Sequence, residues 1–352
     1  MKSKRRILHG PENICGIGGY LASWQRQKTA VADFVTYEDQ TTRQNHHFNL
    51  QLEQYGKVRK VAIMLSFFLV SIFKYDTFHF YFGTTLLPFN IDLPILKLLR
   101  KKILMTYCGS EVRLIEIEKK RNPYSHLLKV GQDNPKFDER KKRMMNWQKK
   151  WVDIFFAPRD LYAHAESLIP KNKIIENIWI HNTIDTCSYI PTSYTPKKIP
   201  VLVHAPSEKG IKGTENVEKA IKELKQEGYQ SEYRCIHKVP YDEAQRIFKH
   251  EADIIIDQLL LGIIGSLAME GMSYGKPVVG YILEDTREKY FSDCPVVNAS
   301  IDTLKEKLVW LIENPKNCEQ LGREGRLFAE NRADRNKVNE QLWEVYEKLW
   351  SN

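Results

Sequence analysis

The chain has 352 residues, more than one hydrophobic core usually serves, and it therefore predicts two domains. Hydrophobic residues make up 42% of the sequence and aromatic residues 11%, which argues against an intrinsically disordered protein. The six cysteines are scattered and include no Cys-x-x-Cys pair, which argues against a disulfide framework or a zinc site. We expect a reduced, cytoplasmic protein.

The net charge of +9 is unevenly distributed along the chain. Residues 1–175 contain 30 Lys and Arg against 16 Asp and Glu, a net charge of +14, whereas residues 176–352 have a net charge of −5. A basic half can contact an anionic surface, either membrane lipid or nucleic acid, or it can simply keep the protein soluble. On charge alone the solubilising role is the simpler interpretation.

Two segments bear on membranes. The N-terminal MKSKRR runs directly into an expected strand, so we expect no secretory signal. The longest apolar run, residues 61–73, is well short of the roughly 20 residues that span a bilayer, so no transmembrane helix is expected. Basic clusters at 57–60, 97–102 and 140–143 fit peripheral attachment to anionic lipid. A core helix with basic flanks is nevertheless the simpler interpretation of the apolar run.

In the first half, segments typical of strands alternate with helical patterns. In chain order the expected strands are RRILH, ADFVTY, TFHFYF, ILMTYC and DIFFAP. The helical patterns between them include GYLASWQRQK, KVAIMLSFFLVSIF and DLPILKLLR.

The second half repeats this alternation. Its expected strands are IPVLVHA, YRCIHK, ADIIID, PVVGYI and CPVVNA, and its clearest helices are TENVEKAIKELKQEG, with Thr214 as N-cap and Gly228 at its end, and YDEAQRIFKHE. From Ile301 onward the pattern is only helical, and Trp343, Tyr346 and Trp350 form a packing stripe. Alternation in both halves predicts two parallel, doubly wound α/β domains, joined near residues 170–182.

Two turns between a strand and a helix could bind a phosphate. Gly16, Gly18 and Gly19 in NICGIGGYLA would let backbone N–H groups approach an anion at the positive end of a helix. Their spacing is not that of a dinucleotide motif, so a nicotinamide cofactor is not expected. In HAPSEKGIKGTE, Lys212 lies two residues before Thr214 and could meet an anion there. A tight turn and a solvated lysine are the structural alternatives.

The segment GSLAMEGMSYGKPVV, residues 265–279, places a carboxylate in a short and mostly buried helix. We expect Ser266 to be the N-cap and Gly275 to end the helix. Because the helix connects two expected parallel strands, its N-terminus lies at their carboxyl ends, where ligands bind. Free N–H groups of Gly265, Ser266 and Leu267 could hold a diphosphate, while Glu270 accepts hydrogen bonds from sugar hydroxyls. A Glu270 paired with a nearby Lys or Arg is the alternative.

Together these features describe a site for a nucleotide sugar, and the motifs resemble those of the retaining GT-B glycosyltransferases of family 4. DQLLLGIIGSL followed by MEGMSYGKPVV is similar to the donor-site signature, KGTENVEKAI to the Lys-Gly turn, NTID to the interdomain motif, GIGGYLA to the N-terminal glycine turn, and TYCGSEVR to a segment of bacterial surface-polysaccharide members. The resemblance covers nearly the whole chain.

The resemblance implies an α/β protein with the GT-B fold, in which two Rossmann-like domains face each other across a cleft. Residues 1–175 would form the acceptor-side domain and residues 176–335 the nucleotide-sugar-binding domain. Residues 336–352 would form a helix that packs back on the N-terminal domain.

The resemblance also implies the reaction and the residues that perform it. The protein would be a retaining, metal-independent hexosyltransferase that moves a sugar from a nucleoside diphosphate sugar to a glycan or lipid-linked glycan. Glu270 would bind the ribose, and Lys212 would neutralise the diphosphate as it leaves. The candidate catalytic residues are thus Lys212, Glu270 and Glu111, and the candidate donor-binding residues are Gly18, Gly19, Lys209, Lys212, Gly265, Ser266, Leu267 and Glu270.

Three positions differ from the family pattern and leave other functions open. Gly262 and Ser207 replace a common Glu and Arg, and Cys108 replaces a His. A non-catalytic scaffold that binds nucleotide or glycan is the main alternative, and a sugar-nucleotide epimerase is a further one.

The expected ligands and partners follow from the same resemblance. No Asp-x-Asp pair occurs and the histidines are dispersed and mostly structural, so neither a metal nor a cofactor other than the donor substrate is expected. The expected partners are the nucleotide sugar, the acceptor and the inner face of an anionic membrane, but not nucleic acid.

Overall fold

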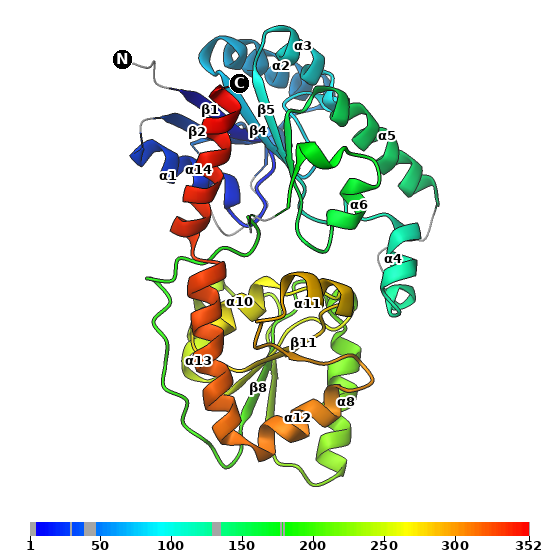
Figure 1. Cartoon of the computed structure of the whole chain (residues 1–352), viewed down its shortest axis with the longest axis vertical. Coiled ribbons are helices and arrows are strands. Elements are labelled where there is room, and N and C mark those ends of the chain that lie inside the picture. The colour runs from blue at the N-terminus through cyan, green and yellow to red at the C-terminus, as the bar shows by residue number, and fades with distance from the viewer. Residues whose placement is uncertain are drawn as a thin grey trace. The chain divides into compact units, whose positions relative to one another are not determined.

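The computed structural model describes residues 5–28, 30–38, 47–128, 135–176, 178 and 180–351, which form two compact α/β units (Figure 1). Unit 1 comprises Met1–Leu114, Asn134–His181 and Asn339–Asn352, and unit 2 comprises Ile115–Asp133 and Asn182–Val338. The segment Ile115–Asp133 therefore belongs to unit 2, although both of its flanking segments in the sequence belong to unit 1.

Unit 1 is built on a sheet in which all described neighbouring strands are parallel. Its order is β3-β2-β1-β4-β5-β6-β7. The five strands expected in the first half are confirmed, and β3 and β7 are two short additions. The bounds are β1 Arg6–Gly10, β2 Val31–Thr36, β3 Phe48–Asn49, β4 Thr77–Tyr81, β5 Lys102–Thr106, β6 Ile154–Phe156 and β7 Ile174–Ile175.

The helices of the N-terminal half connect these strands and confirm the helical patterns of the sequence. They are α1 (Ile17–Gln27), α2 (Lys57–Lys74), α3 (Asp92–Leu98), α4 (Ile115–Arg121), α5 (Pro135–Trp151) and α6 (Tyr162–Glu166). Short 3₁₀ turns occur at Leu52–Gln54, Pro88–Asn90, Ser125–Leu127 and Lys171–Lys173. Because parallel crossovers are right-handed, the connections β3–β4 and β4–β5 place α2 and α3 on the same face of the sheet.

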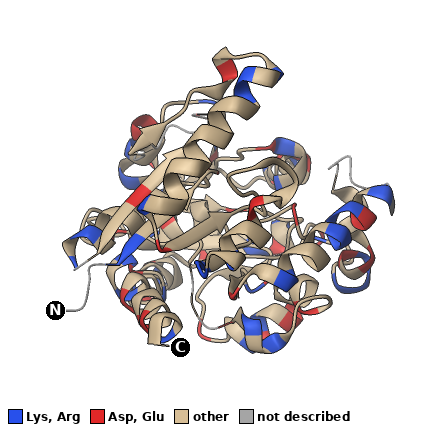
Figure 2. Ribbon diagram, turned by 90° about the horizontal axis from the view of Figure 1, so that it is seen from above, with Lys and Arg blue, Asp and Glu red and all other residues tan. Residues whose placement is uncertain are grey.

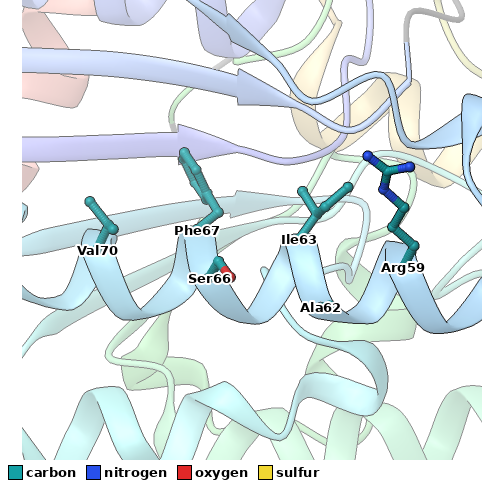
Figure 3. Close-up of a pocket in the computed structure, with 6 residues that line it drawn as sticks. All are labelled: Arg59, Ala62, Ile63, Ser66, Phe67 and Val70. Atoms are coloured by element: carbon teal, nitrogen blue, oxygen red, sulfur yellow. The ribbon is translucent and has the colours of Figure 1, made fainter.

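Helix α2 contains the apolar run at 61–73, and its interpretation as a core helix is wrong. Only Phe68, Ser71 and Ile72 are buried in this helix. An outward stripe consists of Val58, Val61, Leu65, Leu69 and Phe73, with Val58 87% and Phe73 78% exposed. In Figure 3, Arg59, Ile63, Phe67 and Val70 point to one side of α2, where they line a shallow groove with Ala62 and Ser66. The sequence did not reveal this exposure because the helix is apolar on more than one face.

A buried polar network crosses the core of unit 1. His9 Nδ1 and Nε2 lie 2.8 Å from Tyr81 Oη and Gln25 Oε1. His79 lies 2.6 Å from Tyr346 Oη and 2.7 Å from Thr106 Oγ1. Desolvation lowers the pKa of His9 to about 4 and that of His79 well below its usual value, so both imidazoles are neutral in the folded protein. Both histidines therefore have structural roles.

The C-terminal helix α14 (Arg335–Ser351) supplies the other side of this network. Trp343 packs edge-on against Trp24 of α1 with ring centroids 6.3 Å apart, and Trp350 Nε1 donates to Thr77 Oγ1 at 2.9 Å. The aromatic stripe of the sequence is thus a packing surface against α1 and β4.

Unit 2 contains a second sheet whose described neighbouring strands are also all parallel, in the order β12-β11-β10-β8-β9. Its strands are β8 Val201–His204, β9 Glu232–Cys235, β10 Ile254–Ile256, β11 Val278–Gly280 and β12 Val297–Asn298. Its helices are α7 Lys209–Lys212, α8 Thr214–Gln226, α9 Tyr241–His250, α10 Ser266–Ser273, α11 Glu284–Tyr290, α12 Leu304–Glu313 and α13 Pro315–Arg332. All five expected strands of the second half are confirmed.

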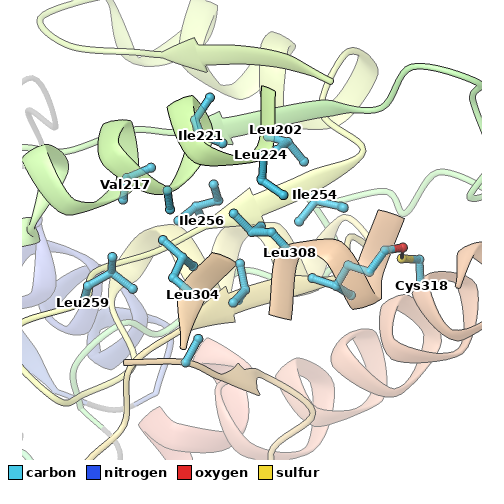
Figure 4. Close-up of a cluster of buried hydrophobic side chains, with 14 residues drawn as sticks. Leu202, Val217, Ile221, Leu224, Ile254, Ile256, Leu259, Leu304, Leu308 and Cys318 are labelled. Atoms are coloured by element: carbon cyan, nitrogen blue, oxygen red, sulfur yellow. Dashed lines mark hydrogen bonds between the residues drawn. The ribbon is translucent and has the colours of Figure 1, made fainter. Parts of the chain in front are cut away.

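The core of unit 2 follows from the alternation of side chains along β10. Ile254 and Ile256 belong to a buried cluster that α8 and α12 complete, for example through Leu224 and Leu308 (Figure 4). Ile255 points to the opposite face, where α10 packs so closely that a Cβ on its Gly271 would lie 3.0 Å from Ile255 Cγ1. The strand is therefore apolar on both faces, as expected for a covered parallel sheet.

Two expected helix caps are wrong, and two helix ends are confirmed. Helices α8 and α10 begin one residue earlier than expected, so Gly213 and Gly265 are the N-caps. The hydroxyl of Thr214 bonds to His204 Nε2 at 3.0 Å instead of capping the helix. Gly228 (φ +91°) and Gly275 (φ +75°) follow the last turns in the left-handed conformation that ends a helix.

Charged residues of both signs are interspersed along the helices (Figure 2). None of the helices in the described part of the chain combines the length and the apolar character needed to cross a membrane.

Candidate functional site

The strand order of unit 2 identifies one edge of its sheet as a candidate ligand site. The chain leaves β8 for β9 on one side and returns to β10 on the other, so the loops after β8 and β10 diverge. Ligands of open parallel sheets bind at such a switch point, at the carboxyl ends of the strands. Helix α7 follows β8, and Asp257, Gln258 and the start of α10 follow β10. The candidate residues of unit 2 all lie in these two connections.

A side-chain amide links Lys212 to the connection that leads to α10. Lys212 Nζ donates to Gln258 Oε1, and Gln258 Nε2 donates to the carbonyl of Ile263. The N–H of Leu259 donates to the carbonyl of Lys212 at 3.1 Å. These bonds hold the Lys212 ammonium at the edge of the sheet. Lys209 lies one turn earlier, on the exposed surface of α7.

Asp257 holds the start of α10, and this corrects the expected role of Gly265. The N–H of Gly265 donates to Asp257 Oδ2 at 2.7 Å, so it is not free to bind a diphosphate. A Cβ on Gly265 would lie 2.7 and 2.8 Å from the two carboxylate oxygens, which explains the need for glycine. Burial raises the pKa of Asp257, while the Lys212 charge and the Gly265 N–H favour the carboxylate.

Two other N–H groups begin helix α10. The first hydrogen bond of its ladder is donated by Met269 to the carbonyl of Gly265 at 3.2 Å. The N–H groups of Ser266 and Leu267 precede it, and within the described residues they have no acceptor. Asn182 steadies this turn, because its Oδ1 accepts from Ser266 Oγ at 2.6 Å and its Nδ2 donates to the carbonyl of Ile264 at 3.1 Å.

Glu270 lies one turn further into α10 and is only 5% exposed. Its carboxylate accepts a hydrogen bond from Gln245 Nε2 at 2.9 Å. The hydroxyls of Tyr241 and Tyr189 lie 3.2 and 3.4 Å from Glu270 Oε1 and 2.6 Å from each other, so one phenol proton joins the two tyrosines and the other can be donated to Glu270. Both distances to the carboxylate are long for a hydroxyl, whose usual separation from a carboxylate is about 2.6 Å. The phenol contacts can therefore be exchanged for shorter bonds from the hydroxyls of a ligand.

Several residues that support Glu270 and Lys212 were not identified from the sequence. Arg326 of α13 donates to the carbonyls of Ser273 at 2.8 Å and Thr186 at 2.9 Å, and also to that of Tyr189, which fixes the Tyr189 loop against α10. Tyr241 and Gln245 were detectable in principle, because they are four residues apart at the start of a helix that follows a strand. Arg326 has no comparable local signal.

The electrostatic effect of the two lysines is visible at His204. Its buried imidazole contacts the carbonyl of Ile256 at 2.9 Å, and its pKa is lowered to about 4, first by desolvation and further by Lys212 and Lys209. Lys212 and Lys209 thus bring two positive charges to this edge of the sheet, where Asp257 contributes a negative one. Within the described residues, His, Cys, Asp and Glu side chains form no cluster that could hold a metal ion.

The remaining candidates, Gly18, Gly19 and Glu111, belong to unit 1. Gly18 has a packing role, since a Cβ there would lie 2.8 Å from the Phe34 ring and 3.0 Å from that of Tyr81. Glu111 follows β5 and accepts N–H bonds from Cys108 and, at 2.8 Å, from Gly109. Desolvation raises the pKa of Glu111 to about 7 despite these bonds. The structure thus collects six of the candidates in unit 2 and three in unit 1.

No protein-family model matches the sequence, and a comparison with curated proteins finds no match. Solved structures resemble the whole chain. Sucrose-phosphate synthase from Thermosynechococcus elongatus has a TM-score of 0.69 at 12% identity, over 99% of both chains. HepE from Anabaena, in complex with UDP and glucose, has a TM-score of 0.66 at 14% identity, over 98% of this chain and 100% of that one. The fold is GT-B.

The same fold includes a different kind of enzyme. UDP-GlcNAc 2-epimerase from Neisseria meningitidis, bound to UDP-GlcNAc, has a TM-score of 0.55 at 14% identity, over 97% of this chain and 99% of that one. Since all these identities are low, the likeness establishes the architecture, and the activity has to be argued from the side chains.

Proposed function

We propose that this protein is a retaining glycosyltransferase that transfers a sugar from a nucleoside diphosphate sugar to a glycan or lipid-linked acceptor without a metal ion. The observation that carries the proposal is the convergence of Lys212, the N–H groups of Ser266 and Leu267, and buried Glu270 at the switch point of unit 2. An ammonium and a helix N-terminus suit a diphosphate, and a carboxylate one turn away suits a ribose.

The reaction places different demands on these groups. Negative charge develops on the diphosphate as its bond to the sugar breaks, and fixed N–H dipoles with a nearby cation stabilise that charge. Gln258 positions Lys212 before the substrate arrives, so little reorganisation is needed. Glu270 binds a part of the donor that does not react, and it therefore contributes affinity and orientation. The complexes of HepE with UDP and with UDP-glucose support a uridine nucleotide as the first ligand to test.

Calorimetric titration with UDP, GDP, ADP and CMP tests the donor site directly. We expect one nucleotide family to bind, and Glu270→Gln to weaken it by about tenfold to a hundredfold, because hydrogen bonds to a charged group are lost. Glu243→Gln is the matched control, since Glu243 is an exposed carboxylate on α9 paired with Arg246. Failure of every nucleotide to bind, or equal affinity in Glu270→Gln, would refute the assignment.

The epimerase alternative is favoured by the Neisseria structure and is separated from transfer by the products. An epimerase converts the nucleotide sugar with no acceptor present, whereas a transferase releases the nucleoside diphosphate and needs an acceptor. Tight nucleotide binding without either product would favour the non-catalytic scaffold.

The acceptor side of the proposal involves an anionic membrane surface. Exposed apolar side chains also occur at α3: Ile91, immediately before the helix, is 51% exposed, and Ile95 and Leu98 within it are 41% and 82% exposed. Lysines and arginines accompany both helices, at Lys57, Arg59, Lys60, Lys74, Lys97 and Arg100. Exposed apolar side chains among cations match the interface of a bilayer that contains anionic lipid.

Sedimentation with lipid vesicles tests this contact. We expect binding to vesicles of phosphatidylcholine and phosphatidylglycerol, little binding to phosphatidylcholine alone, and loss of binding in Leu65→Asp/Leu69→Asp. The control Ile199→Asp/Leu327→Asp places the same charges on exposed apolar positions of unit 2. If both double variants sediment equally, α2 is not the contact surface.

A further inference from the structure

Unit 1 contains a cavity of about 700 Å³ at the carboxyl edge of its own sheet. Tyr37 after β2, the segment after β4 and Glu111 after β5 line it, and α2 and α5 complete its walls. The strand order reverses direction between β1 and β4, so this cavity also adjoins a switch point. None of the donor-binding residues of unit 2 contributes to it.

One wall of the cavity is apolar and aromatic. It is formed mainly by Met64 of α2, Phe82 and Phe89 after β4, and Met144 and Trp147 of α5. The indole N–H of Trp147 donates to the carbonyl of Asn90 at 3.0 Å, so the ring presents a face without an unsatisfied donor. This wall suits a hydrocarbon chain or the apolar face of a ring.

The base of the cavity is held by a buried amide. Gln148 Nε2 donates to the carbonyl of Gly83 at 2.8 Å and to Asn90 Oδ1 at 2.7 Å, while its Oε1 accepts from Tyr107 Oη at 2.7 Å. These bonds connect α5 to the segment after β4. The cavity is therefore formed before a ligand binds.

The other wall is cationic. Arg140, Lys141 and Arg143 of α5 line the cavity, and Glu111 is the one acidic residue among its described lining residues. Both Glu111 oxygens accept N–H bonds from its own loop. Arg140 is exposed and makes no hydrogen bond or ion pair within the described residues, and the Arg143 Nε bond to the Glu139 carbonyl is long, at 3.4 Å. The two guanidinium groups can therefore turn toward an anion at low cost.

We infer that this cavity binds an anionic amphiphile, with its phosphate held by Arg140 and Arg143 and its hydrocarbon part on the wall of Met64, Phe89 and Trp147. A planar guanidinium donates paired hydrogen bonds to phosphate oxygens. A phosphate without an apolar part would leave the aromatic wall unused, and an uncharged lipid would leave the arginines unused.

This inference rests on the proposed function in one respect: it names the acceptor as a phosphate-bearing lipid or lipid-linked sugar. Helix α2 connects the cavity with the exposed groove, because Met64 lines the cavity while Ile63 and Phe67 line the groove (Figure 3). An amphiphile in a membrane contacted by α2 would have its head group near the cavity.

Calorimetric titration of the full chain with octyl phosphate, octyl glucoside and inorganic phosphate, each below its micellar concentration, tests the inference. We expect octyl phosphate to bind at least about tenfold more tightly than either of the others, because only it uses both walls. Arg140→Gln/Arg143→Gln should weaken octyl phosphate about tenfold. Phe89→Gly should also weaken octyl phosphate binding. This variant should fold normally, because Phe89 is 89% exposed and has a φ of +60°, which glycine adopts readily.

The control Lys219→Gln/Lys222→Gln removes two charges from helix α8 of unit 2 and should leave octyl phosphate binding unchanged. Equal binding of octyl phosphate and inorganic phosphate, or of octyl phosphate and octyl glucoside, would overturn the inference, as would equal effects of the two double variants. Nucleotide affinity is measured on the same samples. If nucleotides fail to bind while octyl phosphate binds as expected, the proposed transferase function fails and the amphiphile site stands.

Discussion

Replacing Gly265 by alanine isolates the contact between the start of α10 and the carboxylate of Asp257. Gly265 has φ −86° and ψ 173°, a conformation that alanine adopts without strain. The added Cβ would nevertheless lie 2.7 and 2.8 Å from the Asp257 oxygens. Alanine is also a poorer N-cap than glycine, but the control Gly56→Ala replaces an N-cap glycine too, so the effect of Gly265→Ala beyond that of the control arises from this collision.

The size of the destabilisation follows from the movement of Asp257 that the added Cβ requires. To relieve the collision with the new Cβ, the Asp257 side chain must turn away, and this breaks the 2.7 Å hydrogen bond that it accepts from the Gly265 N–H. A hydrogen bond to a charged group contributes about 1.5–3 kcal/mol, and overpacking a buried site costs about 1–3 kcal/mol. Because one movement relieves the collision and breaks the bond, the two costs overlap. We expect the free energy of unfolding of unit 2 to fall by about 2–4 kcal/mol.

Amide hydrogen exchange of the peptides that cover β10 and α10 measures this change in unit 2 alone. The control is Gly56→Ala, because a Cβ at Gly56 has no atom within 4 Å and its φ is −70°. Its effect should be within about 0.5 kcal/mol. Adding Asp257→Ala to Gly265→Ala should recover part of the loss, since the collision is then absent. Equal effects of the two glycine variants, or simple additivity with Asp257→Ala, would refute the reasoning.

Three further predictions concern other parts of the chain. Arg326→Ala should increase hydrogen exchange in the Tyr189 loop and destabilise unit 2 by about 2 kcal/mol, and Arg326→Lys should restore little, because one ammonium cannot serve three separate carbonyls. The melting temperature should fall between pH 6.5 and pH 4, because buried His9, with a pKa of about 4, stays neutral while the unfolded imidazole takes up a proton. The stabilisation from neutral His9 is complete above about pH 6.5 and is lost as the pH falls toward 4. His9→Asn should make the melting temperature fall less steeply over this range, and an unchanged slope would contradict the role given to His9. Exposed Cys15 and Cys187 should react with a thiol reagent in the native protein, whereas buried Cys294 and Cys318 should react only after unfolding, which peptide mass mapping can check.

Much of the fold could be predicted from local patterns. Strand β10 is apolar on both faces, and α8 carries a regular apolar face, so alternation alone indicated covered parallel sheets. The helix ends at Gly228 and Gly275 were also readable, since glycine is favoured where the backbone must turn left-handed. The N-cap residues were harder to predict from the sequence. A Ser or Thr next to a helix start has the right chemistry at either of two positions, and tertiary contacts with His204 and Asn182 decided where Thr214 and Ser266 lie.

The sequence by itself determined the alternation of strands and helices, the basic character of residues 1–175 and the presence of Lys212 and Glu270 in connections that follow strands. Only the tertiary structure decided what those residues contact. Glu270 is contacted from two separate segments, by Tyr189 and by Tyr241 and Gln245. Asp257 accepts the hydrogen bond of the Gly265 N–H across a turn. The same is true of α2: hydrophobic composition describes a helix, but its exposed stripe depends on which face the sheet covers. Local sequence patterns show whether hydrophobic residues repeat with the period of a helix or of a strand, whereas contacts between distant segments depend on how the whole chain packs.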